Sequence, residues 1–155
     1  MGKENLFAKK DIDMDKIIAI GCDHAAFVLK EAIKKHIRKQ GYAVKDYGCF
    51  SSESVDYPDL IHPLAKDINE GKIKQGIALC GSGIGVSMVA NKYSKVRCAL
   101  CWTSELVKLC RQHNDANVLA LGARFISEKE AIEMVDTFLN TSFEGGRHQA
   151  RVEKI

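Results

Sequence analysis

The sequence has no long hydrophobic run and little net charge. No segment approaches the ~18 consecutive apolar residues that a membrane-spanning helix needs. The formal net charge is only +3, which is too small to indicate nucleic acid or a membrane surface as a partner. The first residues, MGKENLFAKKDIDMDK, lack the apolar segment of a secretory signal. We therefore expect a cytoplasmic protein, with a mobile leader over residues 1–15 and a single domain over 16–155.

The sequence contains six cysteines, but a domain of this size does not need disulfide bonds to be stable. One spacing resembles a zinc site, because Cys98 and Cys101 are followed by Cys110 and His113. However, the segment VRCALC reads as a β-strand, in which residues three positions apart point to opposite faces. Buried thiols are therefore favoured over a metal site.

Five short apolar segments alternate with segments of helical periodicity. The strands are predicted at 16–22, 42–48, 76–80, 96–101 and 117–121, and the helices at about 25–40, 59–70, 84–93, 103–113 and 127–140. Ser127 and Glu130 have the spacing of a capping box at the start of the last helix. This alternation predicts a three-layer, Rossmann-like α/β fold with a five-stranded parallel sheet and helices on both faces. Ligands of such folds bind beyond the carboxyl ends of the strands.

The segment LCGSGIGVSM, residues 79–88, places a cysteine and three glycines at the end of the third predicted strand. A loop with so few side chains exposes backbone N–H groups, which attract anions. Its G-x-G-x-G spacing differs from the dinucleotide fingerprint, and the P-loop lysine is missing. The loop therefore favours a small anionic ligand over NAD or ATP.

Several polar residues follow other predicted elements. Asp23 and His24 come after the first strand, His113 precedes the fifth, and Arg147 and Arg151 lie in the tail. We expect these side chains to converge with Cys80 at one edge of the sheet. If the tail is helical, its two arginines share one face and suit a phosphate group.

Six motifs resemble, in the same order, those of the ribose-5-phosphate isomerase B family: GCDHAAF, SSESVDYPD, CGSGIGVS, ANK, RQHNDANVLALGAR and EGGRHQAR. The resemblance runs from about Lys16 to the C-terminus. It implies interconversion of D-ribose 5-phosphate and D-ribulose 5-phosphate through a cis-enediolate, in the pentose phosphate pathway, without a metal or cofactor. It also implies a homodimer, possibly paired into a tetramer, with active sites between subunits. Related subunits act on galactose 6-phosphate, so an isomerase of six-carbon sugar phosphates such as allose or galactose 6-phosphate remains an alternative. A second alternative is a non-enzymatic module that binds sugar phosphates.

The resemblance also assigns roles to individual residues. Cys80 resembles the catalytic base, and Val86 stands where the other branch of the family carries a glutamate. Ser82 keeps the hydroxyl of the usual threonine and would move protons between O1 and O2, while His113 resembles the acid that opens the sugar ring. The resemblance places the tail arginines in the site of the neighbouring subunit. The expected substrate-binding residues are Asp23, His24, Tyr57, Gly81, Gly83, Ile84, Gly85, Asn114, Arg124, Arg147 and Arg151.

Overall fold

The computed structural model describes residues 13–155. The predicted leader lies mostly outside the described residues, and Met14–Lys16 form a single 3-10 turn that leads into the first strand. The strands are β1 (Ile17–Cys22), β2 (Ala43–Asp46), β3 (Gln75–Cys80), β4 (Cys98–Leu100) and β5 (Val118–Gly122). The α-helices are α1 (Phe27–Lys39), α2 (Tyr57–Asn69), α3 (Ile84–Ala90), α4 (Ser104–Asn114), α5 (Glu128–Asn140) and α6 (Gln149–Val152). Two further 3-10 turns are His24–Ala26 and Gly146–His148.

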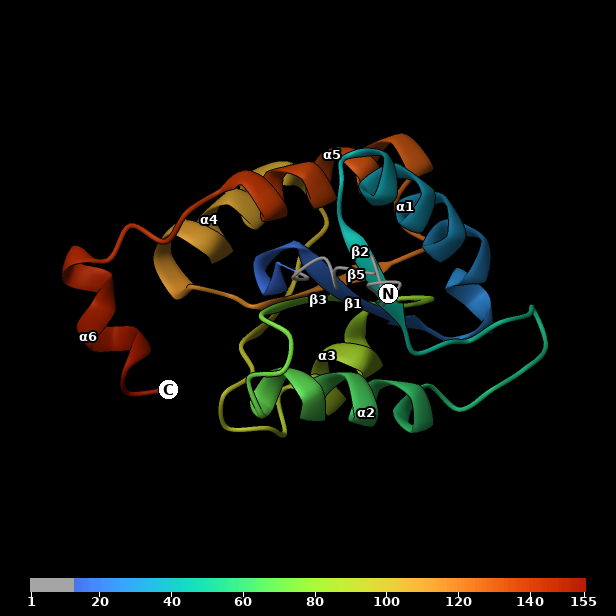
Figure 1. Ribbon diagram of the computed structural model, residues 1–155, viewed down its shortest axis with the longest axis horizontal. Coiled ribbons are helices and arrows are strands. Elements are labelled where there is room, and N and C mark those ends of the chain that lie inside the picture. Colours follow the sequence, from blue (N-terminus) through green and yellow to red (C-terminus); the bar gives the residue numbers. More distant parts are fainter. Residues whose placement is uncertain (1–12) are drawn as a thin grey trace, which may run out of the picture.

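The five strands form one parallel sheet in the order β2-β1-β3-β5-β4. Helices α1, α4 and α5 cover one face of this sheet, and α2 and α3 cover the other (Figure 1). The predicted three-layer α/β fold is therefore confirmed. Among residues 13–155, no helix is long and apolar enough to cross a bilayer.

Local sequence signals account for most of the helix boundaries. The predicted capping box is present, because Ser127 accepts from the backbone N–H of Glu130 and the Glu130 side chain accepts in return. Helix α2 begins two residues earlier than predicted, since Pro58 fits the first turn, where its missing N–H is not needed. Helix α3 ends at Ala90, earlier than the predicted residue 93.

The two faces of the sheet bury separate apolar clusters. The cluster under α1, α4 and α5 contains Cys101, whereas Cys98 packs against the cluster under α2 and α3. The two thiols of the zinc-like spacing thus point to opposite faces, as the strand pattern predicted.

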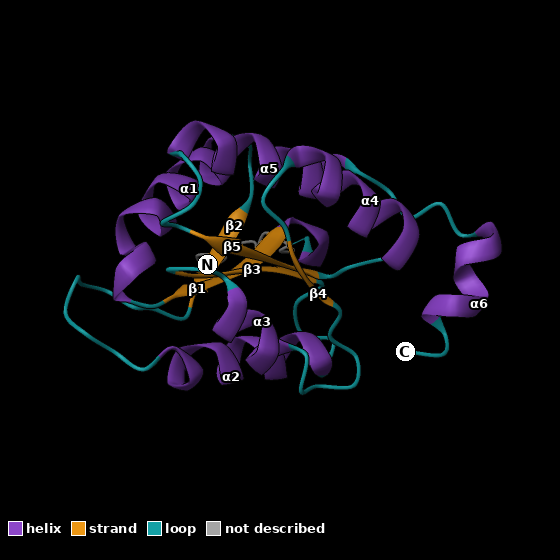
Figure 2. Cartoon of the chain, turned by 180° about the vertical axis from the view of Figure 1, so that it is seen from behind, coloured by secondary structure: helices purple, strands orange, loops and turns teal. Residues whose placement is uncertain are grey.

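The C-terminal arm, residues 141–155, extends away from the three layers. It leaves the end of α5, passes the end of α4 and carries α6, which stands apart from the body (Figures 1 and 2). All four residues of α6 are wholly or partly exposed. The arm is therefore available for contact with another molecule.

Candidate active site

Cys80 and Asp23 lie side by side at the carboxyl edge of the sheet. Cys22 of β1 pairs with Leu79 of β3, and the backbone N–H of Asp23 donates to the Leu79 carbonyl at 3.2 Å. Asp23 follows Cys22 and Cys80 follows Leu79, so Asp23 and Cys80 are neighbours at the ends of two adjacent strands. Both side chains are largely buried, with Cys80 5% and Asp23 8% exposed. A thiol and a carboxyl group thus lie at the position where this fold class binds ligands.

The glycine loop holds the Cys80 thiol from the backbone side. The N–H of Gly83 donates to Cys80 Sγ at 3.1 Å. Gly83 has a φ of +77°, and a Cβ there would lie 2.5 Å from Leu100 Cδ1, so a side chain is excluded by both conformation and space. The Ser82 hydroxyl accepts from the N–H of Ile84 at 3.2 Å, at the start of α3. The loop therefore aims a thiol, a hydroxyl and backbone N–H groups at one small region.

Tyr57 and Arg124 border the loop from two sides. A Cβ on Gly85 would lie 2.6 Å from the Tyr57 hydroxyl oxygen, and one on Gly81 would lie 2.9 Å from Arg124 Nη1. These two glycines make room for a phenol and a guanidinium. The backbone N–H of Arg124 also donates to the Gly81 carbonyl at 3.0 Å. This bond holds the backbone of Arg124 against the loop.

His24 is oriented by the loop that precedes α2. Its Nδ1 accepts from the backbone N–H of Val55 at 3.2 Å. An imidazole nitrogen that accepts carries no proton, so in the neutral ring the proton lies on Nε2. His24 can therefore donate a hydrogen bond to a ligand at this edge.

His113 and Asn114 lie at the opposite, amino edge of the sheet. The carbonyl of Asn114 accepts from Arg97 Nε at 3.2 Å, and Arg97 immediately precedes β4. The expectation that all the polar residues converge at one edge is thus wrong for a single chain. A helix that follows a parallel strand runs back along the sheet, so the end of α4 lies where the strands begin.

The C-terminal arm is joined to this end of α4. The N–H of Glu144 donates to the carbonyl of Gln112 at 3.1 Å. The imidazole rings of His113 and His148 are stacked, with centroids 4.2 Å apart and planes 14° apart. Arg147 and Arg151 are exposed, one helical turn apart on consecutive turns of the arm. One piece of the surface therefore presents a histidine and two arginines.

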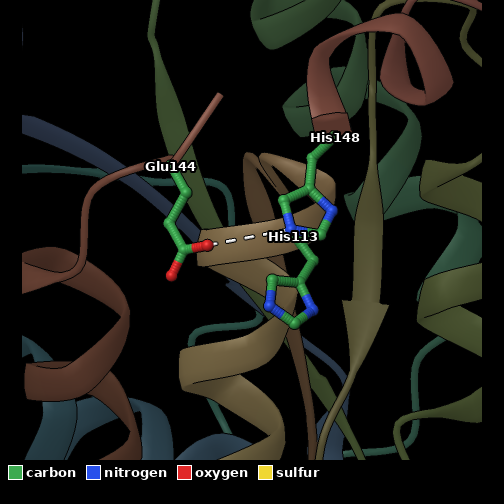
Figure 3. Close-up of side chains that lie close together, drawn as sticks. All are labelled: His113, Glu144 and His148. Atoms are coloured by element: carbon green, nitrogen blue, oxygen red, sulfur yellow. Dashed lines mark ion pairs between the residues drawn. The ribbon is translucent and has the colours of Figure 1, made fainter. Parts of the chain in front are cut away.

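Sequence reasoning did not single out His148 or Glu144. Figure 3 shows both beside His113, with Glu144 Oε2 3.7 Å from His148 Nε2. The only signal was the position of His148 between the two candidate arginines in the motif EGGRHQAR. Stacking between residues 35 positions apart has no local pattern that would reveal it.

These three side chains also have the composition of a metal site. Their ligand atoms lie within 4.8 Å of one another. However, an imidazole lone pair lies in the plane of its ring, and the two rings are nearly parallel. The lone pairs therefore run alongside each other and do not meet at one point, so this arrangement fits a stacked pair better than a metal ion.

The predicted site residues thus form two groups in one chain. The carboxyl edge brings together Asp23, His24, Tyr57, Cys80, Gly81, Ser82, Gly83, Ile84, Gly85 and Arg124. The amino edge and the arm carry His113, Asn114, Arg147 and Arg151.

Comparisons with known proteins agree with this architecture. The family model described as Ribose/Galactose Isomerase matches residues 18–155. The chain is 44% identical over 140 residues to ribose-5-phosphate isomerase B of Escherichia coli, an alignment that covers 90% of this chain and 94% of the relative. Among solved structures, ribose 5-phosphate isomerase from Thermotoga maritima is 46% identical with a TM-score of 0.86, covering 89% of this chain and 95% of that one. The Mycoplasma genitalium enzyme with bound ribulose-5-phosphate is 40% identical with a TM-score of 0.86, covering 89% and 92%.

Proposed function

The chain belongs to the ribose/galactose isomerase family, and we propose that its glycine loop and Cys80 carry out the family's aldose–ketose isomerisation. The protein is a ribose-5-phosphate isomerase of type B, which interconverts D-ribose 5-phosphate and D-ribulose 5-phosphate. We place this reaction in the non-oxidative branch of the pentose phosphate pathway. The main support for the role of Cys80 is the hydrogen bond that the N–H of Gly83 donates to its thiol at the ligand-binding edge.

The reaction moves a proton between C2 and C1 through a cis-enediolate, so it needs one base close to both carbons. Cys80 is this base in our proposal. A thiolate is the active form of a cysteine, and hydrogen bonds to the charged form stabilise it. The N–H of Gly83 supplies such a bond at 3.1 Å. The loop thus holds the sulfur of the proposed base in place from its backbone side.

The negative charge of the enediolate is held by the same loop. In our proposal, the backbone N–H groups between Gly81 and Gly85 that are not bonded to Cys80 Sγ or Ser82 Oγ act as an oxyanion hole. The Ser82 hydroxyl lies at the start of α3 and would pass a proton between O1 and O2. Asp23 and Tyr57 would bind sugar hydroxyls from either side.

The remaining roles require a second copy of the chain. Ribose 5-phosphate exists mostly as a closed ring, and opening this ring needs an acid, for which His113 is the candidate. His113, Asn114, Arg147 and Arg151 lie on the amino edge and the arm, away from Cys80. We propose a homodimer in which these residues complete the site of the other subunit, where the arginines bind the phosphate together with His24 and Arg124.

The surface around the carboxyl edge supports this assembly. Large apolar side chains that follow the ends of four strands are exposed there: Val28, Ile84, Met88, Trp102 and Phe125, between 49% and 75%. Exposed apolar groups gathered on one side of a molecule are typical of an interface. Two such dimers could pair further into a tetramer. A cytoplasmic location suits the proposal, because all six cysteines are free thiols and disulfides are rare in the reducing cytosol.

The related activities of this family differ in the length of the sugar phosphate. The functions of the relatives favour the five-carbon substrate, whereas an allose or galactose 6-phosphate isomerase would use the same chemistry. Steady-state kinetics on D-ribose 5-phosphate, D-allose 6-phosphate and D-galactose 6-phosphate separate them. We expect the highest kcat/KM with ribose 5-phosphate. A higher value with either six-carbon substrate would reassign the substrate, and binding without turnover of any of them would indicate a binding module.

A further inference from the structure

The His148 ring is buried in an arm whose other residues are wholly or partly exposed. The residue is only 8% exposed, whereas its neighbours Arg147 and Gln149 are exposed. The buried ring faces His113, on which it stacks at 4.2 Å (Figure 3). The one inward-pointing residue of this segment therefore packs on the candidate acid.

The charged groups around His148 favour its neutral form. Those that face it are His113 on α4 and Glu144, Arg147 and Arg151 on the arm. Burial lowers the pKa of His148, and the nearby His113, Arg147 and Arg151 lower it further, against the opposing effect of Glu144. A neutral His148 also avoids the repulsion that two stacked imidazolium rings would have.

We propose that His148 is a positioning residue for His113, whose ring plane it fixes by stacking. This inference rests on the proposed role of His113 as the ring-opening acid. Among residues 13–155, no side-chain hydrogen bond holds the His113 ring, so the stack is the contact that orients it. An acid must be aimed at the oxygen that it protonates, and a ring free to rotate would spend little time in that direction.

The arm joins this positioning to phosphate binding. Arg147 directly precedes His148, and Arg151 follows on the next turn. When the two arginines bind a phosphate, the segment between them is held, and His148 is held against His113. One arm would therefore set both the position of the substrate and the direction of the acid.

The two halves of the reaction provide a direct test. D-Ribose 5-phosphate must be opened before isomerisation, but D-ribulose 5-phosphate is already open-chain, because its 5-hydroxyl carries the phosphate and cannot close a furanose. Exchange of solvent deuterium into ribulose 5-phosphate therefore needs the base but not the acid. We would measure this exchange by NMR beside the turnover of ribose 5-phosphate, in His148→Ala, in His148→Phe and in the control Gln149→Ala, which changes an exposed neighbour.

For His148→Ala we expect turnover of ribose 5-phosphate to fall by about tenfold or more, with a smaller change in KM and deuterium exchange within about twofold of wild type. His148→Phe restores a flat ring and should recover most of the turnover. Gln149→Ala should resemble wild type. Wild-type turnover in His148→Ala, equal loss of turnover and exchange, or failure of phenylalanine to rescue would each overturn the proposal. Failure of the proposed roles of Cys80 and His113 would give a different result. Cys80→Ala would then still exchange deuterium, or His113→Ala would still consume ribose 5-phosphate at the wild-type rate.

Discussion

The backbone N–H of Gly83 donates a 3.1 Å hydrogen bond to the sulfur of Cys80, three residues earlier in the chain. This contact exists because Gly83 adopts a left-handed conformation, which turns its N–H back toward the end of β3. The same turn starts α3. One backbone conformation would therefore serve both the proposed base and the proposed oxyanion hole.

Replacement of Cys80 by alanine removes the base while leaving the loop and the arginines in place. We expect turnover of ribose 5-phosphate to fall by roughly 10² to 10⁴-fold, with loss of solvent deuterium exchange into either sugar phosphate. Affinity for a non-reactive sugar-phosphate analogue, measured by calorimetry, should change little. Alkylation followed by mass spectrometry provides a second readout, in which Cys80 should react faster than Cys101, whose pKa is raised by its hydrogen bond with Cys110 and by burial, and should be protected by substrate. Near-normal isomerisation by the alanine variant would show that another group is the base.

Replacement of Gly83 by alanine tests the turn itself. Gly71 is the matched control, since its φ of +74° is nearly the same as the +77° of Gly83 but no atom lies within 4 Å of a Cβ there. Gly71→Ala should cost about 1–2 kcal/mol of unfolding free energy, the cost of the left-handed conformation alone. Gly83→Ala adds a clash with Leu100 and should cost more in denaturant titration, with turnover reduced in the protein that remains folded. Equal stability and full activity of the two variants would contradict this view of the loop.

Most of the fold could be predicted because it depends on local signals. The apolar runs of β1, β3 and β5, the capping box at Ser127 and the glycines after Cys80 are all visible in the sequence. The position of His113 at the other edge was missed, although the direction of a helix that follows a parallel strand would have indicated it. The stacking of His148 on His113 depends on the path of the arm after α5, which no periodicity describes.

Replacement of Arg147 by alanine should weaken substrate binding. A charge-assisted hydrogen bond is worth about 1.5–3 kcal/mol, so KM for ribose 5-phosphate should rise by about 10-fold to 150-fold, with a smaller fall in kcat. Lys154→Ala removes another positive charge from the exposed arm and serves as the control, in which KM should stay near wild type. An unchanged KM in Arg147→Ala would place this arginine outside the site.

Asp46 stabilises the fold by balancing a fully buried lysine. Lys30 Nζ lies 2.8 Å from each carboxylate oxygen of Asp46, and Lys34 adds a third contact at 2.6 Å. Asp46→Asn leaves the Lys30 charge with only the longer, 3.5 Å contact to the half-exposed Glu31 and should cost about 3–5 kcal/mol of unfolding free energy. Glu70→Gln, which breaks an exposed pair with Lys72, should leave stability nearly unchanged. Comparable stability of the two variants would contradict the assigned role of Asp46.

The same pair predicts how stability depends on pH. Burial alone would raise the pKa of the Asp46 carboxyl, but hydrogen bonds from Lys30, Lys34 and the N–H of Gly48 outweigh it and lower this pKa below its usual 3.8. The folded protein therefore binds fewer protons at Asp46 than the unfolded chain does, so this contribution is present above about pH 4 and is lost as the pH falls below it. Denaturant titrations between pH 5 and pH 3 should show a steeper loss of stability in the wild type than in Asp46→Asn. An equal loss of stability with falling pH in the two proteins would show that other carboxylates determine the stability at acid pH.

In our proposal each active site is built from two chains, and mixing two inactive variants tests this directly. Cys80→Ala damages the carboxyl edge, and Arg147→Ala combined with His113→Ala damages the arm and the amino edge. If each site takes Cys80 from one chain and His113 with Arg147 from its partner, half of the dimers in an equal, re-equilibrated mixture are mixed dimers with one intact site, so about a quarter of wild-type activity should return. If the mixture stays as inactive as its two components, while native mass spectrometry confirms that mixed dimers have formed, the shared site is contradicted.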